Sequence, residues 1–191
     1  MKLYDISQEV FSCTVYPGDP KPEKQVLCST GAGDLYNLTA FSMCAHNGTH
    51  IDAPFHFLSD GKTVDQLPLD TFVGDCYVAR HRGDVTAADA AAILEKSGGT
   101  RRLLIAGDIT VTAEAAEVFA ESLKLLGNES QTVGPQNAPM EVHKILLGKE
   151  VALLEGIVLT DVPEGHYLLS AAPLNLKNAD GAPCRAWLME K

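Results

Sequence analysis

Three histidines and one aspartate are crowded into residues 46–56, which read His-Asn-Gly-Thr-His-Ile-Asp-Ala-Pro-Phe-His. An extended strand would point these four side chains to one face, since all occupy even positions: His46, His50, Asp52 and His56. Full extension would hold His46 and His50 about 13 Å apart, whereas metal ligands converge to roughly 2.0–2.2 Å from one ion. Asn47-Gly48 can bend the chain between them because both residues tolerate positive φ. The segment therefore predicts a bent backbone followed by a short strand that carries His50 and Asp52 side by side.

The bent segment is typical of a metal site. His46, His50 and Asp52 would offer two neutral nitrogens and one carboxylate, a set that suits zinc, manganese or ferrous iron. The alternative is a loop that happens to contain separate histidines. An aspartate between them, together with Gly48 and Pro54 at the points where the chain must turn, favours metal binding.

A second group of candidate ligands lies far downstream. His143 shares a helical stripe with Met140 and Leu147, so it can point inward. Glu155 interrupts the apolar run 151–159, where a buried carboxylate needs a cation, a hydrogen bond or a route to solvent. Taken alone, His143 could be a core histidine and Glu155 could face water, and spacing does not show that either reaches the first group.

The rest of the chain predicts a mixed α/β layout, with a β-rich first half followed by helices interleaved with strands. Thr86 and Thr112 are candidate N-caps and glycines mark the expected helix ends. The expected helices run from 86 to the glycines at 98 and 99, from 112 to 127, and from near Pro139 to 148. The expected strands are 2–7, 36–44, 72–81, 102–105, 151–154, 167–171 and 185–189.

Length and composition narrow the functional classes. With 191 residues and 46% hydrophobic content, the chain is expected to form one domain spanning 1–191. The formal net charge of −10 argues against nucleic acid or an anionic membrane surface as partner. We expect neither a secretory signal nor a membrane span. Five widely spaced cysteines, none in a C-x-x-C pair, favour free thiols in a reducing cytoplasm.

The motif His46-x-Gly48-Thr49-His50-x-Asp52-Ala53-Pro54-x-His56 resembles the signature of the cyclase-like metal hydrolases, a family that includes bacterial kynurenine formamidases and isatin hydrolases. Other similar pieces lie along nearly the whole chain: Asp5-Ile6-Ser7, Tyr16-Pro17-Gly18-Asp19-Pro20, Leu67-Pro68-Leu69-Asp70, Leu154-Glu155-Gly156-Ile157-Val158-Leu159 and Ala182-Pro183-Cys184-Arg185-Ala186.

The resemblance implies a single-domain swivelling β/β/α-type fold with a mixed β-sheet core and flanking helices, and a homodimer or higher oligomer. It implies one or two divalent ions, zinc or alternatively manganese. His46, His50 and Asp52 would hold the first ion, and Asp52 would bridge to a second ion completed by His143 and Glu155. His56 matches the histidine that the family uses for proton transfer.

Three features differ from the family pattern. Tyr16 stands where formamidases commonly have tryptophan, and we expect it to contact the substrate. The stretch 128–134 lacks the usual Asp and Ser residues, and the segment 106–109 is short where relatives often carry a longer loop over the pocket.

The resemblance implies hydrolysis of an amide C–N bond, with an N-formyl arylamine of tryptophan catabolism as the leading substrate. The alternatives are opening of a cyclic amide or lactone, and a metal-binding domain without turnover. His56 argues against the last alternative, because a storage site needs no spare acid–base group.

Overall fold

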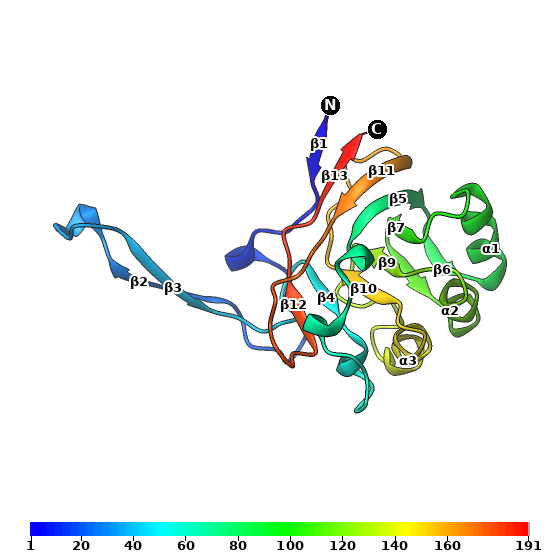
Figure 1. The fold of residues 1–191 in the computed structure, drawn as a ribbon, viewed down its shortest axis with the longest axis horizontal. Coiled ribbons are helices and arrows are strands. Elements are labelled where there is room, and N and C mark those ends of the chain that lie inside the picture. Colours follow the sequence, from blue (N-terminus) through cyan, green and yellow to red (C-terminus); the bar gives the residue numbers. More distant parts are fainter. Residues whose placement is uncertain (191) are drawn as a thin grey trace.

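The computed structural model describes residues 1–190 of the chain, and a mixed sheet of nine strands forms its centre (Figure 1). The middle of the sheet is parallel, β5 to β7, β7 to β9 and β9 to β10, and the remaining pairs are antiparallel. In spatial order the strands are β1 (Leu3–Asp5), β13 (Trp187–Glu190), β11 (Gly165–Ser170), β5 (Val73–Arg80), β7 (Arg102–Ala106), β9 (Leu125–Asn128), β10 (Ala152–Glu155), β4 (His50–Asp52) and β12 (Gly181–Pro183).

Three α-helices within these residues lie together on one side of the sheet (Figure 1): α1 (Ala87–Lys96), α2 (Ala113–Ala120) and α3 (Met140–Gly148). Thr86 caps α1 and exchanges hydrogen bonds with Asp89 in a capping box. Phe119 and Leu146 are fully buried against the sheet, where they share a core with Leu103. None of the helices in residues 1–190 has the length and apolar character that a membrane crossing requires.

The opposite face of the sheet curls around a second core. Successive strand residues point to opposite faces, so Leu104 packs in this second core while its neighbour Leu103 faces the helices. The same alternation places Ile51 of β4 and Leu154 of β10 in the second core. His50, Asp52 and Glu155 must therefore face the side on which α3 lies.

A two-stranded hairpin, β2 (Glu23–Cys28) with β3 (Leu38–Ser42), extends well away from the rest of the molecule (Figure 1). Its apolar side chains include Val26, which is 60% exposed, and Phe41, which is 57% exposed. A short parallel pair, β6 (Gly83–Val85) with β8 (Ile109–Val111), lies beside the helices.

The expected α/β class, with a mixed sheet core and flanking helices, is confirmed. One element differs: the helix expected over 112–127 ends at Ala120, and Leu125–Asn128 forms β9 instead. The apolar residues at 125 and 126 fit either a helix or a strand locally, but hydrogen bonding to β7 on one side and β10 on the other makes this segment a fully buried central strand. The sequence also did not indicate β2, β6, β8 or β12, which are short or polar.

Candidate metal centre and active site

The bend expected before the short strand is present at Gly48. Its φ is +62°, a conformation that favours glycine, and an added Cβ would lie 2.8 Å from Cβ of Cys13. The chain then enters β4, whose His50 and Asp52 are both buried. The turn and the strand together return His46 to the same side as His50, with their ring centroids 5.2 Å apart.

Asp52 is the point at which two groups of possible ligands meet. Its Oδ1 lies 2.8 Å from His46 Nδ1 and 3.3 Å from His50 Nε2. Its Oδ2 lies 3.7 Å from Nε2 of His143, which α3 supplies. One carboxylate thus faces both groups, with one oxygen on each side.

Glu155, at the end of β10, closes the second group. Its Oε1 lies 3.5 Å from His143 Nε2 and accepts a hydrogen bond from the Val133 amide at 2.7 Å. Its Oε2 lies 3.8 Å from His50 Nε2. The structure therefore brings His143 and Glu155 to the first group, which spacing alone did not show.

Backbone carbonyls orient two of the imidazoles. His50 Nδ1 donates to Gly48 O at 3.0 Å, and His143 Nδ1 donates to Pro139 O at 2.8 Å. A carbonyl can only accept, so each ring carries a proton on Nδ1, and Nε2 is the nitrogen that a metal ion could bind once the ring is neutral. This is the tautomer that a metal ligand requires.

The buried carboxylates of the cluster favour positive charge on their neighbours, as the pKa shifts of the histidines indicate. Burial lowers the pKa of His46, but hydrogen bonds to Asp180 and Asp52 outweigh it and raise the pKa to about 10. Burial likewise opposes protonation of His143, whose pKa is nonetheless raised through Glu155. Burial raises the pKa of Asp52, yet hydrogen bonds from the neighbouring histidines hold the pKa of this carboxyl well below its usual range. Without an ion, protons on the imidazoles balance the buried carboxylates.

The donor set fits a divalent cation. Within each group, one possible ligand atom per residue lies within 4.8 Å of the others: His46, His50 and Asp52 in the first, and Asp52, His143 and Glu155 in the second. Two ligands held about 2.1 Å from one tetrahedral ion are about 3.4 Å apart, close to the separations found here. Imidazole and carboxylate donors in this proportion suit a divalent transition metal. The cluster therefore could hold a divalent metal ion.

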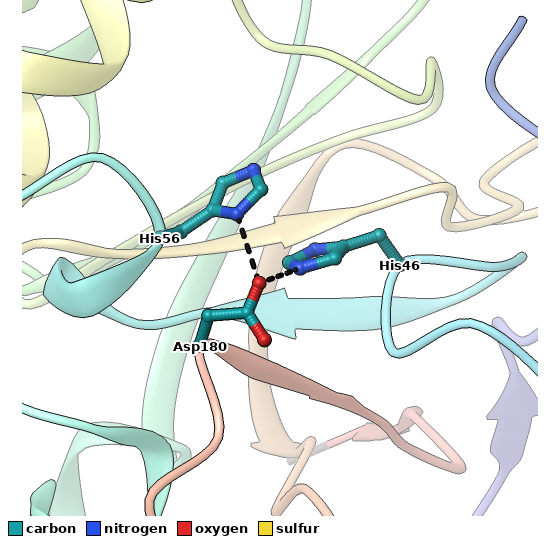
Figure 2. Close-up of side chains that lie close together, drawn as sticks. All are labelled: His46, His56 and Asp180. Atoms are coloured by element: carbon teal, nitrogen blue, oxygen red, sulfur yellow. Dashed lines mark hydrogen bonds and ion pairs between the residues drawn. The ribbon is translucent and has the colours of Figure 1, made fainter. Parts of the chain in front are cut away.

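His56 lies beside this cluster. Its ring stacks on that of His46, with centroids 4.0 Å apart, and Phe57 packs against it edge to face. Its Nδ1 lies 3.3 Å from Asp180 Oδ2, and the same oxygen lies 2.8 Å from His46 Nε2 (Figure 2). Asp180 was not predicted from the sequence, because an aspartate before a glycine is typical of a turn and its partners are 124 and 134 positions away.

A cavity of about 420 Å³ opens over the cluster, and Tyr16 lines it together with Cys44 and Asp19. The Tyr16 hydroxyl donates to Gln136 O at 3.0 Å. Gln131 and Thr132 also line the cavity, and within residues 1–190 the buried Oε1 of Gln131 and Oγ1 of Thr132 have no hydrogen-bond partner. Buried polar groups are normally satisfied, so these two atoms are candidates for contact with a bound molecule.

Comparison with known proteins identifies a family whose sequence profile includes the bent segment 46–56. The sequence profile of the Cyclase family matches residues 4–133, which is more than half of the chain and includes the bent segment. The chain belongs to the cyclase family. The matched region contains His46, His50, Asp52 and His56 and ends before His143 and Glu155.

Full-length relatives agree with this assignment. A kynurenine formamidase from Erythrobacter litoralis is 33% identical over 203 residues, covering 99% of this chain and 94% of the relative. A solved structure described as a potential metal-dependent hydrolase with cyclase activity is 28% identical, with a TM-score of 0.83 over 100% of this chain and 99% of that chain. The structure of isatin hydrolase A from Labrenzia aggregata has a TM-score of 0.86 at 22% identity, over 98% of this chain and 93% of that chain. This likeness shows that the two chains share a fold. With the cluster described above, these relatives make the chain a metal-dependent hydrolase that acts on amide C–N bonds.

Proposed function

We propose that this protein hydrolyses an N-formyl arylamine to formate and the free arylamine, as an arylformamidase of tryptophan catabolism. The observation that carries the proposal is the position of Asp52 between two groups of ligands, with His56 beside the first. The formamidase relatives support the formyl substrate. The aromatic rings of Tyr16 and Phe57 in the cavity wall support the aryl group.

We further propose the roles of the ligands. His46, His50 and Asp52 hold one ion, and Asp52, His143 and Glu155 hold a second, with zinc as the native metal and manganese as the alternative. A divalent ion here lowers the pKa of bound water to about 7 and polarises a carbonyl oxygen. The protein contributes the buried carboxylates, the fixed tautomers of His50 and His143, and a cavity that holds the substrate above them.

His56 is proposed to move the proton. Because Nδ1 donates to Asp180, the neutral ring has an unprotonated Nε2. This nitrogen can take a proton from the attacking water and return it to the departing amine. The C–N bond breaks, the hydroxyl oxygen stays on the formyl carbon, and the proton neutralises the amine.

The test combines metal analysis with a substrate panel. Purified protein is analysed for bound metals and assayed with formylkynurenine, formanilide, isatin and simple lactones, before and after chelation. We expect divalent metal in the protein and metal-dependent turnover that is fastest on the formyl arylamines. Faster turnover of isatin or lactones would replace the proposal with ring opening, and full metal occupancy without turnover would indicate a binding domain.

A homodimer is proposed as the working assembly, with the β2–β3 hairpin as its contact. A two-stranded hairpin alone is marginally stable in water, and this one exposes Val26, Phe41 and Leu38, which is 43% exposed. A second copy carries the same apolar arm, so a two-fold arrangement would cover both. Light scattering should give twice the chain mass for the wild type and the monomer mass for a Val26→Ser, Phe41→Ser variant. A monomeric wild type would refute this assembly.

We also propose a cytoplasmic location. The five cysteines are free thiols in the described structure, which suits a reducing compartment. Fractionation of cells expressing the tagged protein would test this, and recovery from an oxidising compartment would contradict it.

A further inference from the structure

Asp180 joins the first group of ligands to the proton carrier through a single oxygen. Its Oδ2 accepts from His46 Nε2 at 2.8 Å and from His56 Nδ1 at 3.3 Å (Figure 2). The carboxylate contacts the edges of the two stacked rings and lines the cavity. Among the aspartates and glutamates of residues 1–190, it is the one whose carboxylate forms hydrogen bonds with both His46 and His56.

The contact with His46 determines which nitrogen of that ring is free. A carboxylate only accepts, so Asp180 holds a proton on Nε2 of His46; when the ring gives up its second proton to bind a metal ion, Nδ1, which faces Asp52 Oδ1, is the nitrogen left free. The other two imidazoles of the cluster are oriented by backbone carbonyls. Among the three, His46 alone takes its orientation from a side chain, and its ligand nitrogen is Nδ1 instead of Nε2.

The contact of Asp180 with His56 likewise determines which nitrogen of the ring carries the proton. Donation of Nδ1–H to Asp180 leaves Nε2 of the neutral ring as the nitrogen that can accept a proton. Stacking against His46 limits rotation of the ring. One carboxylate thereby sets both the ligand nitrogen of His46 and the basic nitrogen of His56.

Strand pairing holds Asp180 in place. β12 pairs with β4 so that Gly181 lies opposite Asp52, and the Ala53 amide donates to Asp180 O at 2.9 Å. Gly181 has no Cβ, which would lie 2.7 Å from Cε1 of His46. The backbone of β12 therefore passes close to the His46 ring and places the Asp180 carboxylate at the Nε2 edge of that ring.

We propose that Asp180 is a positioning residue that fixes the His46 tautomer for metal binding and the His56 tautomer for proton transfer, an inference that rests on the proposed function. Partners of this kind typically change metal affinity by 10–100-fold when removed. The competing interpretation is that Asp180, His46 and His56 themselves bind an ion, because their ligand atoms also lie within 4.8 Å of one another. Since Nδ1 of His46 already faces Asp52, that ion would require both nitrogens of one ring as ligands.

The test compares Asp180→Ala and Asp180→Asn with the wild type and with Asp65→Asn. Asp65 accepts from the Asn178 amide at 3.0 Å, so this control disturbs the same loop without touching a histidine. Zinc affinity of the metal-free proteins is measured by chelator competition, together with the number of ions bound. Thermal unfolding of the metal-free proteins is recorded, and kcat and KM for formanilide are measured at saturating zinc.

We expect Asp180→Ala to weaken zinc binding by about 10–100-fold and to lower kcat at saturating zinc with little change in KM. Asp180→Asn should recover part of both, because its Oδ1 can still accept from the rings, and Asp65→Asn should resemble the wild type. Unchanged affinity in Asp180→Ala, or an equal loss in Asp65→Asn, would overturn the inference. Loss of one ion with the other bound normally would instead assign Asp180 as a ligand. A wild type that binds no zinc would refute the proposed function itself.

Discussion

Glu155 lies directly opposite His50 in the antiparallel pairing of β10 with β4. Their side chains leave the same face of the sheet, and His50 Nε2 lies 3.8 Å from Glu155 Oε2. The neighbouring pair, Leu154 with Ile51, enters the core on the opposite face. One register thus builds the core on one side of the sheet and one wall of the metal site on the other.

Asp52→Asn should abolish metal binding and activity together. The amide carries no charge and cannot offer an anionic oxygen to each group of ligands. Metal content by mass spectrometry and turnover of formanilide should both fall to background. Asp161→Asn, which changes an exposed carboxylate, is the control. Retention of a full metal complement by Asp52→Asn would contradict the bridging role.

His56→Ala should lower turnover by about 10²–10⁴-fold, the usual contribution of a positioned acid–base group. Metal content should stay at the wild-type level, because His56 faces Asp180 and not Asp52 or Glu155. His166→Ala removes an exposed imidazole from β11 and should leave both quantities unchanged. If His56→Ala lost metal, its assignment as a proton carrier would be wrong.

Metal uptake should release protons at pH 7.5. In the metal-free protein the pKa of His46 is about 10, so this ring is protonated and must lose a proton before it can bind a metal. Apparent affinity should therefore rise as pH increases from 6.5 toward 10 and fall as pH decreases. Calorimetry in buffers of different ionisation enthalpy counts the protons. A count near zero at pH 7.5 would show that His46 is not protonated before binding.

Gly181→Ala should weaken metal binding by displacing His46. The added Cβ would meet Ile51 O at 2.6 Å and His46 Cε1 at 2.7 Å, so either β12 or the imidazole must move. Gly148→Ala is a matched control, because nothing lies within 4 Å of its added Cβ. The zinc dissociation constant and thermal unfolding of both variants measure the effect. Equal zinc affinity in the two variants would show that the site tolerates the added methyl group.

Tyr16→Ala should raise KM for formanilide several-fold with a smaller effect on kcat. The ring lines the cavity but is not within either group of ligands, so its loss should weaken binding of an aromatic substrate before and during reaction alike. Tyr16→Phe keeps the ring and removes only the hydrogen bond to Gln136 O. Steady-state kinetics on formanilide and an aliphatic formamide distinguish the two contributions. An unchanged KM in Tyr16→Ala would place the aryl group elsewhere.

Much of the first group of ligands could be predicted because its information is local. His46, His50 and Asp52 lie within seven residues, and Gly48 between them marks the bend that strand geometry requires. The N-cap at Thr86 and the end of α3 at Gly148 were also predicted from neighbouring residues. The assignment of 1–191 to one domain and the individual roles of the site residues stay predictions.

The sequence by itself determined the ligand types, the bend and the α/β class, since these depend on residue chemistry and short-range periodicity. Only the tertiary structure decided that Leu125–Asn128 is a strand, that Glu155 faces His50, and that Asp180 contacts Nε2 of His46. Each of these depends on pairing between strands that are distant in the chain. Register between such strands is set by burial across the whole sheet, and no local pattern contains it. In the segment 46–56, residue chemistry therefore supplied the candidate ligands, and strand pairing supplied the Asp180 carboxylate that contacts His46 and His56.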